Sequence, residues 1–369
     1  MAFFKYVWIW MAVVWLLTVF LREYVYSEEI VCGRRKIRVR VGFAVITWLP
    51  FIIGAATRKA TYADTGMYLK EFHKMPSSIG AIPGYLMNVP KDQGFYALSA
   101  LIKAVFGENT IIYLGIIALI QGLILAMVFR KYSSDFLLST FLFLATTDYI
   151  SWMHNGIRQF MAVTIIFAGT ALFVKRRFVP AILLILLAST MHQSALLMLP
   201  VLFIVQGRAW NLRTVLLLAA ALLAIAYVGR FTDLLDGMLS NTQYSSVVSD
   251  WKEWEDDGTS PIRVFIYSIP TILSLVGLRY IREADDPFVN VCVNMSIIST
   301  GLYLISMVTS GIFIGRLPIY CSLWGMGCLL PWEIRHMFTP RSALALKLMA
   351  ILGFLGFYYY QMHIGWGLI

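Results

Sequence analysis

One polar cluster in the sequence combines an arginine with side-chain amides at helical spacing. In the segment Asn155-Gly156-Ile157-Arg158-Gln159, the side chains of Asn155, Arg158 and Gln159 stand at i, i+3 and i+4, positions that share one face of a helix. A guanidinium forms paired hydrogen bonds with a phosphate, and amides can orient a sugar. Two interpretations follow: a site for a sugar phosphate, or a polar seam between packed membrane helices.

Five arginines, Arg158 among them, stand at the ends of apolar segments that we assign to the outer side of a membrane. Basic residues normally concentrate on the cytoplasmic side, and ionisable groups in or near spans are costly and usually functional. Any one of these arginines fits contact with lipid headgroups, but the whole set favours a bound anion such as phosphate. Its members are Arg58, Arg158, Arg230, Arg263 and Arg316.

A histidine and an aspartate are the candidate general bases. His192 and Gln193 interrupt the apolar run of residues 181–205, and imidazole titrates near neutrality and commonly accepts protons in catalysis. The alternative for His192 is a structural hydrogen bond inside the helix bundle. Asp64 precedes Tyr68 by four residues. Its carboxylate fits a base, a group that orients substrate, or a structural partner of an arginine.

Continuous apolar segments place these residues in a membrane protein. The chain has 369 residues, of which 59% are hydrophobic and 14% charged, whereas soluble proteins average about 25% charged residues. Apolar runs of about 15–22 residues match a hydrocarbon core about 30 Å thick, while β-barrel strands would alternate in polarity. We therefore predict an all-α, polytopic membrane helical bundle that forms a single integral membrane domain over residues 1–369.

Basic clusters set the predicted orientation. The loop after the first apolar run is rich in arginine, which places it in the cytoplasm and the N-terminus outside. About 12 transmembrane helices then alternate, leaving two long extracytoplasmic loops at 58–107 and 231–261. Residues 94–106 are predicted as a re-entrant or interfacial helix because they are short for a span. The predicted spans are 3–21, 41–56, 110–129, 135–149, 156–174, 178–190, 194–205, 214–228, 262–278, 289–307, 317–330 and 344–360.

The sequence carries no signal for a cofactor. The four cysteines show neither a CxxC pair nor Cys/His ligand spacing, which argues against both disulfides and zinc. No P-loop, HExxH or GxSxG motif occurs. The net charge of +10 lies mainly in clusters beside apolar runs, as in membrane proteins rather than nucleic-acid binders. We therefore expect no cofactor, no metal and no nucleic acid partner.

Several motifs, in chain order, resemble the EpsG-like branch of the O-antigen and exopolysaccharide polymerase (Wzy) family. The most specific is Asn155-Gly156-Ile157-Arg158-Gln159 followed by Met191-His192-Gln193-Ser194-Ala195. Two departures leave the role of the Asp64 region open: Asp64 lacks the preceding glycine of the family pattern, and Asp92-Gln93 replaces Glu-Pro. The other motifs are Ala63-Asp64-Thr65-Gly66-Met67-Tyr68 after Arg58, Asp92-Gln93-Gly94-Phe95-Tyr96, and Arg316 with Tyr320.

The resemblance implies a GT-C-like glycosyltransferase of the bacterial inner membrane with its active site facing the periplasm. Such enzymes move a growing glycan from undecaprenyl diphosphate to a lipid-linked oligosaccharide repeat unit. Arginines at the departing diphosphate would stabilise the transition state. The partners that the resemblance implies for this protein are the lipid-linked donor and acceptor, the bilayer and a chain-length regulator. The expected roles are diphosphate binding by Arg158 and Arg316 with help from Arg58, proton removal by His192 or else Asp64, and substrate binding by Asn155, Gln159, Tyr68 and Gln193.

Three other functions stay open. A flippase for lipid-linked glycans would need a polar cavity reachable from both faces, with charged residues in the middle of spans. An O-antigen ligase would use the same donor and an outer arginine-rich site but a lipid A core acceptor. A membrane O-acyltransferase would use a histidine but has less need of several outer arginines.

Overall fold

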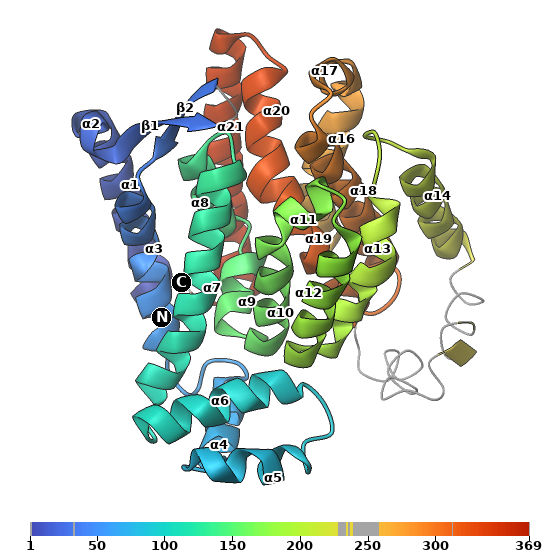
Figure 1. Ribbon diagram of the computed structural model, residues 1–369. Helices are drawn as coiled ribbons and strands as arrows, with labels where there is room; N and C mark the ends of the chain where they lie inside the picture. Colours follow the sequence, from blue (N-terminus) through green and yellow to red (C-terminus); the bar gives the residue numbers. More distant parts are fainter. Residues whose placement is uncertain are drawn as a thin grey trace. The chain divides into compact units, whose positions relative to one another are not determined.

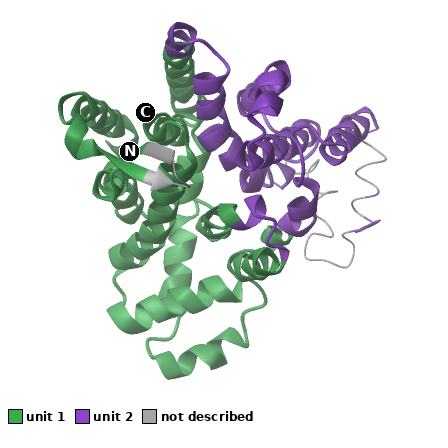
Figure 2. Cartoon of the chain, turned by 45° about the horizontal axis from the view of Figure 1, so that its top comes forward, with its two compact units in different colours: residues 1–171, 179–196, 346–369 green, residues 172–178, 197–345 purple. Residues whose placement is uncertain are grey.

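The computed structural model describes residues 2–31, 34–227, 258–311 and 313–368, together with residues 234, 237 and 238. The chain forms two compact units (Figure 2). Unit 1 comprises residues 1–171, 179–196 and 346–369, and unit 2 comprises residues 172–178 and 197–345. Most of the predicted second outer loop, including Trp251 and Trp254, lies outside the described residues, as does Arg230.

Unit 1 is built around α7 (Thr110–Tyr132) and α3 (Val41–Ala56), which pack along each other (Figure 1). Small residues permit the close approach: a Cβ at Gly122 would lie 2.7 Å from Ile52 Cγ1. Fully buried Trp48 fills the neighbouring space against aromatic rings. The other helices of this unit are α1 (Ala2–Phe20), α8 (Phe136–Ala145), α9 (Asp148–His154), α10 (Ile157–Ala168), most of α12 (Phe178–Met191) and most of α21 (Pro340–Tyr359).

A short helical module covers the Thr110 end of α7 (Figure 1). It contains α4 (Thr65–Lys74), α5 (Ile82–Leu86) and α6 (Gln93–Phe106). Phe72 of α4 stacks on Tyr113 of α7 with ring centroids 4.1 Å apart, which fixes the module on the long helix. The first predicted outer loop is therefore largely helical, and the interfacial position of α6 stays a prediction.

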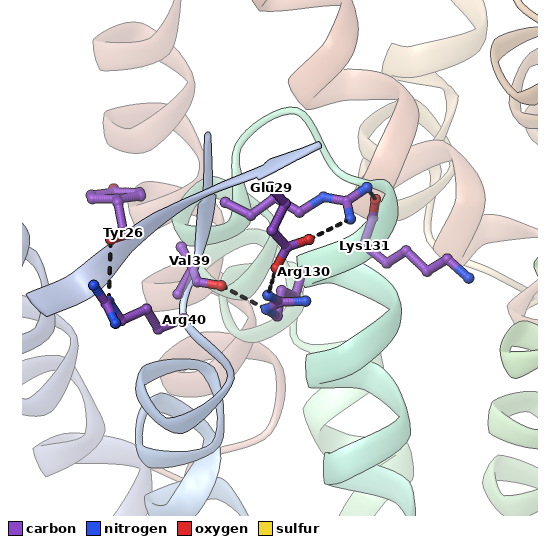
Figure 3. Close-up of polar contacts among 7 residues, drawn as sticks. Tyr26, Glu29, Val39, Arg40, Arg130 and Lys131 are labelled. Carbon is purple, nitrogen blue, oxygen red and sulfur yellow. Dashed lines mark hydrogen bonds and ion pairs between the residues drawn. The ribbon is translucent and has the colours of Figure 1, made fainter. Parts of the chain in front are cut away.

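The predicted basic cytoplasmic loop is instead a β-hairpin of β1 (Tyr26–Val31) and β2 (Arg34–Val39), preceded by α2 (Arg22–Val25). Figure 3 shows how it joins α7: Glu29 forms ion pairs with Arg38 and Arg130, and Arg130 donates to the Val39 carbonyl. The two arginines hold the pKa of the Glu29 carboxyl below its ordinary value. The basic residues thus have a structural use beyond setting orientation.

Unit 2 surrounds α18 (Pro287–Met307), which is buried along most of its length. Its small and hydroxylated residues let neighbours approach: Thr271 lies 2.7 Å from Ser296 and 2.8 Å from Thr300, oxygen to oxygen. The other helices of unit 2 include α13 (Met198–Ile204), α14 (Leu212–Ala226), α16 (Pro261–Val276), α17 (Leu278–Ala284), α19 (Ile319–Trp324), a π-helical turn (Gly325–Leu329) and α20 (Leu330–His336).

The polytopic helical class is confirmed, and most described residues of the predicted spans are helical, although turns interrupt the predicted spans 135–149, 156–174 and 262–278. Among the described residues, four helices are long and apolar enough to cross a membrane, and six if two bent pairs each count as one span. The pair α8 and α9 bends by 72°, and α16 and α17 by 70°. Six further apolar helices have 10–17 residues, which is short for a span. The number of about 12 spans stays a prediction.

Candidate functional site

An ion pair joins three distant segments of unit 1. Arg158 Nη1 donates to Asp92 Oδ2 across 3.0 Å, and the other oxygen, Asp92 Oδ1, accepts the backbone N–H of Gln193 at 3.1 Å. The Asp92 side chain is only 3% exposed. Asp92 was not a predicted site residue, yet it links the two motifs of the most specific sequence block.

Two tyrosine rings flank the Arg158 guanidinium. Its Cζ atom lies 5.9 Å from the ring centroids of both Tyr68 and Tyr96, within the range of cation–π attraction. The Arg158 Nε atom is buried and has no hydrogen-bond partner in the described part of the chain. The guanidinium is therefore held by the Asp92 carboxylate, by a side-chain hydrogen bond with Tyr68 and by the neighbouring aromatic rings, while Nε stays buried without a partner among the described residues.

Burial also shapes the charge of Asp92. Desolvation raises the pKa of its carboxyl above the ordinary value of 3.8, while Arg158 and the Gln193 N–H oppose the rise. Because a nearby positive charge favours the ionised form of a desolvated carboxyl, Arg158 counteracts the effect of burial on Asp92. The carboxylate and the guanidinium therefore act as one positioned unit.

The predicted shared face of Asn155, Arg158 and Gln159 is wrong because the helix breaks inside the motif. Asn155 is extended at the end of α9, with φ −116° and ψ −175°, and α10 begins only at Ile157. Gly156 makes the turn with φ 34°, a left-handed conformation that favours glycine. A Cβ there would lie 2.2 Å from the Trp152 ring. The break places Arg158 in the first turn of α10.

Asn155 and Arg58 instead fix the start of α4. Asn155 Oδ1 accepts the backbone N–H of Asp64 at 3.3 Å. Arg58 donates from Nε to Thr65 Oγ1 at 3.0 Å and from Nη1 to the Ala55 carbonyl at 2.5 Å. Its Nη2 is buried without a hydrogen-bond partner among the described residues. The Asp64 residue is exposed, so its carboxylate is accessible at the N-terminus of α4.

His192 follows the last residue of α12 and is half-buried. Its Nδ1 lies 2.7 Å from Ser194 Oγ and accepts the Ser194 backbone N–H at 3.4 Å. These contacts, assigned from geometry, favour the tautomer with the proton on Nε2. The next residue, Gln193, has an exposed side chain, and its backbone N–H binds Asp92. His192 therefore directly precedes a residue that contacts the carboxylate of the ion pair.

Gln159, Arg316 and Tyr320 were also singled out in the sequence. Gln159 is buried within α10. Arg316 ends the 3₁₀ turn Ile314–Arg316 of unit 2, where it is exposed, and Tyr320 is buried in α19. Unit 1 therefore gathers Arg58, Asp64, Tyr68, Asn155, Arg158 and the Gln193 backbone.

Sequence reasoning missed Asp92 and Tyr96. Both belong to the Asp92–Tyr96 segment that carries part of the family resemblance, and that segment was the available signal. Asp92 also has φ 57°, which is uncommon outside glycine and typical of functional or turn positions. In the described part of the chain, no three His, Cys, Asp or Glu residues are arranged to hold a metal ion.

Comparison with protein families gives one match. The model described as "EpsG family" matches residues 41–365, which include all of the residues gathered in unit 1. No curated protein and no solved structure matches the chain. The match begins at α3, after α1 and the β-hairpin. Because it spans far more than half of the sequence, this chain belongs to the EpsG family.

Proposed function

We propose that the protein is a GT-C-like polysaccharide polymerase of the bacterial inner membrane. It transfers a growing glycan from undecaprenyl diphosphate to a lipid-linked oligosaccharide repeat unit at the periplasmic face. The observation that carries the proposal is the oriented Arg158 guanidinium, which Asp92 holds at 3.0 Å and which lies 5.9 Å from each of two tyrosine rings. Membership of the EpsG family supports the polymerase class.

The transfer exchanges one bond at the anomeric carbon of the donor sugar. A hydroxyl oxygen of the acceptor forms the new glycosidic bond, and the bond to the diphosphate oxygen breaks with both electrons going to the diphosphate. The acceptor proton passes to a base. Negative charge therefore grows on the departing diphosphate, where a fixed cation stabilises the transition state more than the ground state.

Arg158 is suited to receive that charge. Asp92 binds Nη1 and Tyr68 forms a further hydrogen bond, while the Arg158 side chain stays 19% exposed, so the guanidinium is proposed to offer its remaining donors to phosphate oxygens. Phosphate recognition by arginine depends on this planar fork. Arg58, Arg316, Asn155, Gln159, Tyr68 and Gln193 are proposed to assist in binding substrate.

His192 is the first candidate for the base and Asp64 the second. With the proton on Nε2, His192 must present Nδ1 to the acceptor, which requires Ser194 to release that atom. Asp64 is exposed at the start of α4 and needs no such change. Separate His192→Ala and Asp64→Asn variants therefore distinguish the two bases by which one abolishes transfer.

The test is a reaction with purified protein and lipid-diphosphate-linked repeat units, without metal or nucleotide sugar, and with products resolved by size. A ladder of multiples supports the polymerase. Two rival functions have their own readouts. Movement of the same lipid across proteoliposomes without a ladder would identify a flippase, and transfer to a lipid A core acceptor in place of a ladder would identify a ligase.

A further inference from the structure

Unit 2 contains a polar cavity whose residues serve no part of the proposed reaction. It has a volume of about 300 Å³ and forms where three loops meet, at the lower end of the usual size of ligand pockets. The charged lining groups are Arg176, Arg208 and Asp285, which sequence analysis assigns to the cytoplasmic side. Gln206 and Asn290 add side-chain amides.

Buried asparagines hold the central loop of this cavity in a fixed shape. Asn290 Oδ1 accepts the Ala209 N–H at 2.9 Å, and Asn294 Oδ1 accepts the Trp210 N–H at 3.1 Å. Asn294 Nδ2 donates to the Val205 and Arg208 carbonyls at 3.0 and 3.1 Å. The backbone that carries Arg208 is therefore positioned by α18 before any ligand binds.

Backbone strain is concentrated around the same cavity. Arg176 has φ 54° and Asp285 has φ 42°, both in the left-handed region that side chains rarely adopt. Gly207, with φ 103°, lines the cavity between them. Such conformations cost free energy and cluster at ligand sites.

The cavity offers both hydrogen-bond donors and hydrogen-bond acceptors to a ligand. The guanidinium groups of Arg176 and Arg208 form no ion pair within the described residues. Asn290 commits Oδ1 to Ala209, which leaves its Nδ2 as a third donor. On the acceptor side are the Asp285 carboxylate and the Gln206 Oε1, because Gln206 Nε2 donates to the Phe173 and Leu202 carbonyls.

We infer that this cavity binds a phosphoethanolamine group, supplied by a phospholipid headgroup of the bilayer. A phosphodiester accepts hydrogen bonds from the two guanidinium groups and the Asn290 amide. The primary ammonium donates to Asp285 and Gln206. The presence of a carboxylate beside the guanidinium groups favours this zwitterion over a purely anionic headgroup, which has no positive charge for Asp285 to bind.

The test measures lipid binding rather than polymerisation, so it is independent of the proposed function. Purified, delipidated protein in detergent is titrated with phosphatidylethanolamine, phosphatidylcholine or phosphatidylglycerol, and bound lipid is counted by native mass spectrometry. Phosphatidylethanolamine is expected to bind best, because the quaternary ammonium of phosphatidylcholine has no N–H to donate. Equal binding of the three lipids by the wild-type protein would overturn the inference.

Variants test which residues bind the phosphate of the headgroup and which bind its ammonium. Arg176→Ala and Arg208→Ala should each weaken phosphatidylethanolamine binding by about tenfold, the effect of one lost charge-assisted hydrogen bond. Asp285→Asn should remove the preference over phosphatidylglycerol. The controls are Arg177→Ala and Glu283→Gln, which are nearby and exposed but do not line the cavity.

Three results would count against the site. They are unchanged binding in the Arg176→Ala/Arg208→Ala double variant, an equal loss in Arg177→Ala, and binding of soluble phosphoethanolamine without binding of the lipid. The last result would exclude the bilayer as the source of the ligand. Because the substituted arginines are exposed, the variants should keep wild-type size-exclusion profiles and helical content, which is checked for each.

Discussion

Replacing Asp92 by asparagine removes the charge that holds Arg158 while changing little else. Asparagine keeps an oxygen for the Gln193 N–H and tolerates the φ of 57° at this position. The Asp92 and Arg158 side chains are 3% and 19% exposed. Breaking a fully buried pair costs about 3–5 kcal/mol. Because Arg158 keeps some solvent contact and two aromatic neighbours, we expect a loss of about 2–3 kcal/mol.

A double-mutant cycle isolates this interaction. The free energy of unfolding is measured by denaturant titration in detergent for the wild type, Asp92→Asn, Arg158→Gln and the double variant. The expected coupling energy is about 1.5–3 kcal/mol. Asp64→Asn is the control, since Asp64 is exposed and its side chain makes no capping hydrogen bond, and it should change stability by less than about 0.5 kcal/mol.

Additive effects would refute the reasoning. If the Asp92 and Arg158 substitutions sum to within about 0.5 kcal/mol, the two residues do not interact energetically. The ion pair would then not orient the guanidinium, and the phosphate-binding role of Arg158 would lose its structural basis.

Three further predictions concern the framework around the site. Gly156→Ala should destabilise the protein by at least about 1–2 kcal/mol, because the backbone is left-handed and an added Cβ would lie 2.2 Å from the Trp152 ring. Gly353→Ala, where an added Cβ meets nothing within 4 Å, should not destabilise it, and thermal unfolding compares the two variants. Arg58→Lys should lower stability by about 1 kcal/mol, since one ammonium cannot replace both guanidinium hydrogen bonds, to Thr65 and to the Ala55 carbonyl. Wild-type stability of the lysine variant would contradict this. Arginines lower the pKa of the Glu29 carboxyl below 4.5, so its stabilising effect is present above pH 4.5 and is lost as the pH falls through the lowered folded value. The unfolding temperatures of the wild type and Glu29→Gln should therefore converge in acid. A constant difference between them down to pH 3 would contradict the assignment.

Much of the helical framework could be predicted because hydropathy reports directly on long apolar helices. The predicted segments 41–56 and 110–129 coincide with α3 and α7. Breaks inside helices could not be predicted in the same way. The bend between α8 and α9 occurs at Thr146 and Thr147, neither of which is a strong helix breaker, so tertiary packing decides its position.

The site was predictable in residue type more than in geometry. The sequence indicates Arg158 as a site residue because an arginine near a membrane span is energetically costly and usually functional. In the structure Arg158 has a buried carboxylate partner. Helical spacing does not hold across Asn155–Gln159, because Gly156 has a left-handed φ and separates α9 from α10. Asp92 was missed because 66 residues separate it from Arg158, and no local pattern in one sequence reports such a contact.

The most direct test of the central claim is the length of the polymer made by Arg158→Lys. Lysine keeps the positive charge but loses the planar fork that binds phosphate oxygens in pairs. Purified wild type, Arg158→Lys and the exposed control Arg177→Lys are incubated with lipid-diphosphate-linked repeat units, and the products are resolved by size. We predict a full ladder for the wild type and the control and almost no product beyond the starting unit for Arg158→Lys. A ladder of near-normal length from Arg158→Lys would contradict the role of Arg158 at the diphosphate.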